Sequence, residues 1–304
     1  MHHFRTTHAC ADEQSVALSD SPEQFKAARA AGDLSDQPLS GQCWGIMFSK
    51  SSTRTRVSFE VGIRELGGNA MFFSSRDLQL GRGEPIRDTA RVMGRMMHGA
   101  VIRNDSQADI EAFAEFSGIP TINALTDLEH PCQILADLLT MRESVGGWEG
   151  KKVAFVGDAD CNVARSWIWA AKHLGFELAL AGPEGFCPDE DYLAKVGAPN
   201  VSCGHDPMVA ADGADVLYTD VWISMGREDE AAAREEAFAG YQINADLLEN
   251  ANNGAAVMHC LPAYRGKEIT DEVLEAHADT IFSEAENRLH VQKAVLAAVA
   301  PARR

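Results

Sequence analysis

The stretch CWGIMFSKSSTRTRVSFEVGIRELGG, from Cys43 to Gly68, decides the fold of this chain. Its first six residues form an apolar run, which predicts a buried β-strand. From Arg54 to Leu66, apolar side chains recur at the spacing of a helix, and the glycine pair that follows predicts the helix end. A strand followed by a helix of this length is the repeating unit of a parallel α/β fold.

The strand and helix unit recurs along the chain. Further strands are predicted at 70–73, 100–102, 120–123, 153–156, 178–181, 216–219 and 256–260. Helices are predicted at 86–97, near Glu111, and at 130–143, 163–174 and 286–299. We therefore predict an α/β fold with two doubly wound parallel-sheet domains joined by interdomain helices. Residues 1–143 would form the first domain and 144–285 the second, with a C-terminal helix at 286–304 that packs back on the first.

Composition limits the classes of function. The chain has 304 residues, which favours two domains, and its net charge of −18 at pH 7 argues against binding to nucleic acid or anionic membranes. No apolar run approaches a membrane span, and the N-terminal region lacks a signal-peptide pattern. Seven cysteines without a Cys-x-x-Cys pair or zinc spacing predict reduced thiols. We expect a cytoplasmic protein that binds neither nucleic acid nor membrane and needs no metal or cofactor.

The polar segment STRTR, residues 52–56, follows the first strand and opens the helix. A helix N-terminus offers free N–H donors and a favourable dipole to an anion, and arginine side chains add charge. This pattern predicts a phosphate site without a P-loop. The alternative, a simple N-cap, leaves two hydroxyls and both arginines unexplained. Arg103 follows the 100–102 strand and would reach the same sheet edge.

Two donor side chains, His130 and Gln133, lie three residues apart at the start of a predicted helix. Both can donate to a carbonyl oxygen and so stabilise the oxyanion formed when that carbonyl is attacked. The alternative is a helix start with His130 as its cap.

In the second half, Asp220 ends a strand and a loop with Ser224 follows. An acid and a hydroxyl in this setting suit an ammonium group. Asn162 opens the helix after the first strand of this half and could meet a carboxylate, although a plain N-cap explains it equally well. Cys260 also ends a strand, where it could be packing or a reactive thiol, and Pro262 could carry a cis bond.

Together these segments resemble the aspartate/ornithine carbamoyltransferase family. The resemblance extends over nearly the whole chain in the family's order and is weakest in the first forty residues. It is carried by STRTR (52–56), Arg103, HPCQ (130–133), DVWISMG (220–226), HCLPA (259–263) and ENRLH (286–290).

The resemblance implies attack of an amine on the carbamoyl carbon of carbamoyl phosphate, with oxyanion stabilisation and no covalent intermediate. It also implies a homotrimer with active sites at subunit interfaces, in which Gln79 reaches a neighbouring subunit's phosphate site. The implied catalytic residues are Arg54, Arg103, His130, Gln133, Cys260 and Asp220. The residues implied to bind carbamoyl phosphate are Ser52, Thr53, Arg54, Thr55, Gln79, Arg103, His130, Gln133, Cys260, Leu261 and Arg288.

The second half resembles the ornithine branch of the family. This likeness implies that Asp220 and Ser224 hold the α-amino group, and that Asn162 and the Met225 backbone hold the carboxylate. Cys260 would lie near the δ-amine. Many family members reach the Asn162 position with one residue fewer after the preceding strand, which leaves the carboxylate contact open.

Three other functions fit the sequence less well. An NAD-dependent dehydrogenase would need a G-x-G-x-x-G turn after Val156, where the chain instead has Gly157, Asp158, Ala159 and Asp160. A carbamoyltransferase for putrescine or an acylated ornithine would not need Asp220 and Ser224 to hold a charged α-amine. A non-catalytic scaffold would not need every polar position to be retained.

Overall fold

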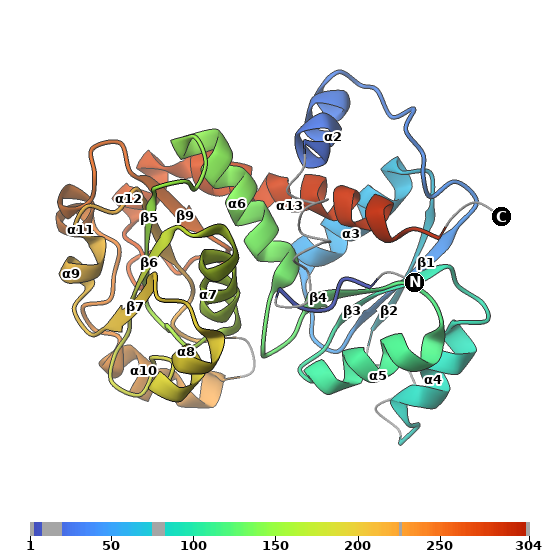
Figure 1. Cartoon of the computed structure of the whole chain (residues 1–304), viewed down its shortest axis with the longest axis horizontal. Helices are drawn as coiled ribbons and strands as arrows, with labels where there is room; N and C mark the ends of the chain where they lie inside the picture. Colours follow the sequence, from blue (N-terminus) through green and yellow to red (C-terminus); the bar gives the residue numbers. More distant parts are fainter. Residues whose placement is uncertain (1–2, 8–19, 75–82, 225–226, 302–304) are drawn as a thin grey trace. The chain divides into compact units, whose positions relative to one another are not determined.

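The computed structural model describes residues 3–7, 20–74, 83–224 and 227–301 (Figure 1). The chain divides into two compact units, one formed by Met1–Ala136 with Glu286–Arg304 and the other by Asp137–Ala285. Helices α6 (Pro131–Val145) and α13 (Ala278–Val299) each run from one unit into the other. The division therefore falls within two continuous helices.

The first unit is built on a four-stranded sheet with the order β2-β1-β3-β4, in which every neighbouring pair is parallel. Its further elements, in chain order, are α2 (Ser21–Ala30), β1 (Cys43–Phe48), α3 (Thr53–Glu65), β2 (Asn69–Ser74), α4 (Ile86–Met93), β3 (Gly99–Arg103), α5 (Gln107–Ser117) and β4 (Thr121–Leu125).

Both faces of this sheet are covered. Met47 and Ile102 belong to a buried cluster that includes Ile110 and Phe113 of α5. Helix α3 packs closely against α13 at Gly62, where an added Cβ would lie 3.3 Å from Cγ of Lys293. A larger residue at this position would require the Lys293 side chain to shift by a few tenths of an ångström.

The second unit contains a five-stranded parallel sheet with the order β7-β6-β5-β8-β9. Its elements, in chain order, are β5 (Lys152–Val156), α7 (Asn162–Leu174), β6 (Glu177–Ala181), α8 (Glu190–Val196), β7 (Val201–Gly204), α9 (Pro207–Ala211), β8 (Val216–Thr219), the 3-10 helix η2 (Glu228–Glu230), α10 (Ala231–Ala237), α11 (Ala245–Asn250), β9 (Ala256–His259) and α12 (Asp271–Ala276).

Alternating side chains of this sheet enter two different cores, which is why β5 is a continuous apolar run. Ala154 and Val156 pack with α9, α11 and α12. On the other face Trp167 of α7 contacts Tyr218, with 5.1 Å between ring centroids. Figure 1 shows the sheet between α9 and α11 on one side and α7 on the other.

In each sheet, the direction in which successive strands are added reverses at one place. This place lies between β1 and β3 in the first unit and between β5 and β8 in the second. Ligands of open α/β sheets bind beyond the carboxyl ends of the strands at such a switch point. Each unit therefore has one expected binding edge. None of the helices that the structure describes is both long and apolar enough to cross a membrane.

The predicted fold class, two doubly wound α/β domains, is confirmed. The predicted start of the last helix at residue 286 is wrong, because α13 already begins at Ala278 and no glycine or proline interrupts the chain between them. The predicted helix at 86–97 ends early, with Gly94 as its C-cap. The cis bond suggested for Pro262 is present between Leu261 and Pro262.

Trp167 should contribute strongly to the stability of the second unit because it is fully buried against Phe176 and Tyr218. We expect Trp167→Ala to lower the free energy of unfolding by about 3–5 kcal/mol, measured by urea denaturation. Val209→Ala, at a position that is 69% exposed, is the control and should change it little. Equal unfolding midpoints for the two variants would contradict this packing.

Candidate functional site

The start of α3 lies at the switch point of the first sheet. Ser52 occupies the N-cap position, yet its side chain makes no capping hydrogen bond to any described residue. The N-cap alternative therefore does not account for this hydroxyl. The first N–H groups of a helix also have no acceptor within the helix, so this edge presents several donors at once.

Arg288 of α13 joins three helices of the first unit. Its guanidinium donates to Oγ1 of Thr55 in α3 at 3.0 Å and to Oε1 of Gln133 in α6 at 2.6 Å. All three side chains are buried. Because the Gln133 carbonyl is occupied by this bond, the amide nitrogen is the part of that side chain suited to donate to a ligand.

Positive charge gathers around Arg103 at the end of β3. Burial, followed by the guanidinium groups of Arg288 and Arg54, lowers the pKa of Arg103 to about 10. Its Nε is buried and has no hydrogen-bond partner within the described part of the chain. Cations held together in this way repel one another, and an anion bound among them would remove that repulsion.

His130 precedes α6 and is buried beside these cations. Burial, followed by Arg288 and Arg103, lowers the pKa of His130 well below its ordinary value. The imidazole is therefore neutral at physiological pH. A neutral imidazole can donate one N–H to a carbonyl oxygen without adding further positive charge.

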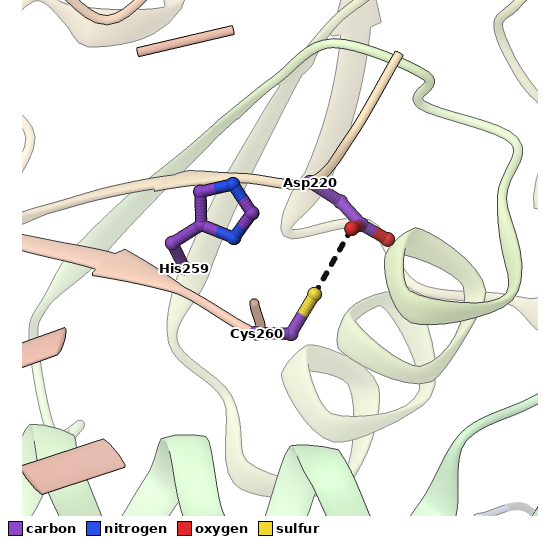
Figure 2. Close-up of side chains that lie close together, drawn as sticks. All are labelled: Asp220, His259 and Cys260. Atoms are coloured by element: carbon purple, nitrogen blue, oxygen red, sulfur yellow. Dashed lines mark hydrogen bonds between the residues drawn. The ribbon is translucent and has the colours of Figure 1, made fainter. Parts of the chain in front are cut away.

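In the second unit, Asp220 and Cys260 follow the neighbouring strands β8 and β9. Figure 2 shows the Cys260 side chain directed at the Asp220 carboxylate, and its thiol donates to Oδ1 at 3.0 Å. Desolvation, followed by the charge of Asp220, raises the pKa of Cys260 well above its ordinary value. The residue is thus a neutral thiol at neutral pH.

His259 lies next to this pair, and ligand atoms of Asp220, His259 and Cys260 all fall within 4.8 Å of one another. Both imidazole nitrogens are nevertheless engaged. Nδ1 accepts from the Leu261 N–H at 2.9 Å, so Nε2 carries the proton and donates to buried Glu268 at 3.2 Å. The imidazole would have to break one of these bonds to bind a metal, so we assign it to holding the loop after β9.

Asn162 is the first residue of α7, and the N-cap position belongs to Cys161, whose sulfur accepts from the Ala164 N–H at 3.4 Å. The N-cap alternative for Asn162 is therefore wrong. Ser224 is half-buried after β8. The predicted site residues Gln79 and Met225 lie outside the described residues.

Sequence reasoning missed two carboxyl groups that support the end of β9. Glu284 accepts the His259 N–H at 2.8 Å and hydrogen-bonds Asp137. Burial, followed by Asp137, raises the pKa of Glu284 well above its ordinary value, so the two groups share a proton. The available signal was Asp137 itself, an acid within the apolar stretch of the 130–143 helix.

The cation cluster predicts that the first unit binds phosphate without any second substrate. Inorganic phosphate should raise the melting temperature relative to chloride at equal ionic strength, with a stabilisation of about 2.7 kcal/mol at 100 times its Kd. Arg103→Met and Arg54→Ala should reduce this shift, whereas Arg91→Met, at a 55% exposed side chain, should keep it. If phosphate raised the melting temperature of Arg103→Met as much as that of the wild type, phosphate would bind at another site.

Comparisons with known proteins bear on the whole chain. The aspartate/ornithine carbamoyltransferase family profile matches twice, with its carbamoyl-P binding domain at residues 2–143 and its Asp/Orn binding domain at 149–299. An ornithine carbamoyltransferase of Akkermansia muciniphila is 62% identical over 269 residues, which are 88% of each chain.

Solved structures agree with these matches. The ornithine carbamoyltransferase of Pyrococcus furiosus superposes with a TM-score of 0.92 at 41% identity, over 99% of this chain and 98% of that one. The anabolic enzyme of Campylobacter jejuni gives 0.89 at 40% identity, over 97% and 98%. The resemblance seen in the sequence is confirmed, and the chain belongs to the aspartate/ornithine carbamoyltransferase family.

Proposed function

We propose that this chain is a cytoplasmic ornithine carbamoyltransferase of arginine metabolism, which converts carbamoyl phosphate and L-ornithine to L-citrulline and phosphate. The observation that carries the proposal is the cluster of the cations Arg54, Arg103 and Arg288 in a chain of this family. The names of the relatives support ornithine as the acceptor.

The first unit would bind the donor. The open N–H groups and hydroxyls at Ser52 and Thr53 suit a phosphate, and the three arginines match its charge. Thr55, His130 and Gln133 would surround the carbamoyl oxygen as donors. The bonds from Arg288 to Thr55 and Gln133 support this assignment, because they hold two of the three donors in fixed positions.

The second unit would bind the acceptor. Asp220 and Ser224 would hold the α-amino group, while Asn162 and the Met225 backbone would hold the carboxylate. We further assign Cys260 and the Leu261 backbone to the reacting end of the substrates. The place of Asp220 beside β5 and β8, where the strand order reverses, supports this assignment.

The proposed reaction needs no covalent intermediate. A primary amine such as that of ornithine, with a pKa near ~10.4, must first lose a proton. Cys260 suits this step as a neutral thiol, since a thiolate would stabilise the ammonium form instead. The neutral amine would attack the carbamoyl carbon, the donors would stabilise the oxyanion, and the departing phosphate would take the proton. Most of the acceleration would come from holding the two substrates together.

We also propose a homotrimer in which Gln79 completes a neighbouring subunit's site. Apolar side chains left exposed on the first unit support self-association, since an exposed apolar surface favours an interface. They are Val57, Met71, Val92 and Met96.

Formation of the ureido product from carbamoyl phosphate, assayed with ornithine, putrescine, N-acetylornithine and aspartate in parallel, tests the proposed acceptor. We expect ornithine to give the highest kcat/KM, because it alone carries a charged α-amino group and a carboxylate in addition to a separate reacting amine. Arg54→Ala should lose nearly all turnover and serves as the inactive control. Preference for another acceptor would reject ornithine but would leave carbamoyl transfer standing.

The pH dependence tests the need for a neutral amine. At pH 8 only about 0.4% of such an amine is neutral, and this fraction grows about tenfold per pH unit. The kcat/KM for ornithine should therefore climb from pH 6 to 9 when chemistry limits the rate. His130 should not contribute to the profile, because its lowered pKa keeps it neutral throughout. A flat profile across this range would count against the mechanism.

A further inference from the structure

Arg234 of α10 is a buried charge that neither the proposed chemistry nor the sequence motifs explain. Its side chain is only 2% exposed. The guanidinium donates from Nε to the Trp222 carbonyl at 2.5 Å and from Nη2 to the carboxylate of Asp158. It also lies over the rings of Phe186 and Phe238, at 4.7 and 5.3 Å from their centroids.

Arg234 also donates to Glu230 at 3.4 Å, and its other two partners belong to the two loops assigned to the acceptor. Asp158 follows β5 in the loop that leads to Asn162, and Trp222 lies between Asp220 and Ser224. Strands β5 and β8 are neighbours at the point where the strand order reverses. A single guanidinium therefore connects both loops at the binding edge of the second sheet.

Trp222 is held in place by contacts of its side chain as well as by the hydrogen bond to its main-chain carbonyl. Its indole N–H donates to the Tyr241 carbonyl at 3.3 Å, and the ring stacks on Phe238 with 6.0 Å between centroids. The Arg234 bond fixes the main chain of the same residue. The backbone between Asp220 and Ser224 thus has little freedom to turn either side chain away.

A role in stability alone does not account for this arrangement. Burial raises the pKa of Asp158, and the opposing effect of Arg234 is smaller. Buried ion pairs can often be replaced by apolar residues without loss of stability. What only the planar arginine fork provides is a simultaneous bond to a carboxylate on one loop and a carbonyl on another.

We propose that Arg234 is a positioning residue for the acceptor, which sets the spacing of the Asp158 and Trp222 loops and so the places of Asn162, Asp220 and Ser224. This inference rests on the proposed ornithine site. It concerns the acceptor alone, because Arg288, not Arg234, bonds Thr55 and Gln133 of the carbamoyl phosphate site.

Steady-state kinetics with both substrates, combined with melting temperatures, test the proposal on the full chain. The variants are Arg234→Met, Arg234→Lys, and the double variant Asp158→Asn with Arg234→Met. The double variant removes both buried charges, so it should recover most of the stability lost in Arg234→Met. Arg265→Met, which breaks two surface ion pairs of the same unit, is the control.

We expect Arg234→Met to raise the KM for ornithine about 10- to 100-fold, the usual effect of losing a charged hydrogen bond. The KM for carbamoyl phosphate should change less than about twofold. Arg234→Lys should lie between, because a lysine keeps the charge but cannot bond both loops in the same plane. The double variant should regain its melting temperature and keep the raised KM, because the donor to Trp222 is still missing.

Two results would overturn the proposal. One is a wild-type KM for ornithine in folded Arg234→Met, and the other is a KM that recovers together with stability in the double variant. A wild-type protein that prefers a different acceptor would instead reject the proposed function. The KM for that acceptor would then have to rise in Arg234→Met for the inference to stand.

Discussion

Every described strand of each sheet runs parallel to its neighbours, so each crossover brings the chain back before the next strand begins. All strands of one unit therefore end at one edge, and the residues after them are collected there regardless of their separation in sequence. In the first unit this edge gathers the start of α3 and Arg103. In the second it gathers Asp158, Asp220 and Cys260. Parallel pairing thus fixes where a ligand can meet several segments at once.

The two edges differ in how their charges are balanced. Burial, followed by the charges of Arg288 and Arg54, lowers the pKa of Arg103, and the three cations gathered at the first edge suit a dianion. In the second unit Arg234 is paired with Asp158, and His259 with Glu268. A cation paired with one acid holds loops in place, whereas several cations gathered at one edge attract an anionic ligand. Donor binding and acceptor positioning follow from this difference.

Three buried acids hold the main chain at the end of β9 through hydrogen bonds. The pair formed by Asp137 and Glu284 holds the His259 N–H, while Glu268 accepts from the His259 ring and from the Tyr264 N–H. These bonds fix the main chain on both sides of Cys260. The thiol is therefore directed at Asp220 by backbone that is hydrogen-bonded before and after it.

Local patterns in the sequence determined the α/β class and the positions of β1, β3 and β5, because a buried parallel strand must be apolar throughout. They also located the polar residues that follow these strands. Short strands such as β7, whose side chains are alternately half-buried and exposed, carry too weak a pattern to be recognised. The sequence pattern did not predict the early start of α13. A helix that continues from one unit into the other has no capping residue at the point where the unit changes.

Only the tertiary structure decided which polar residues meet. Arg288 bonds Gln133 and Thr55 across 155 and 233 positions of sequence, and Arg234 bonds Asp158 across 76. No local period carries such pairings, since they depend on how helices and loops pack around a completed sheet. The neutral state of His130 and the thiol state of Cys260 are likewise set by burial and neighbouring charge, which exist only once the chain has folded.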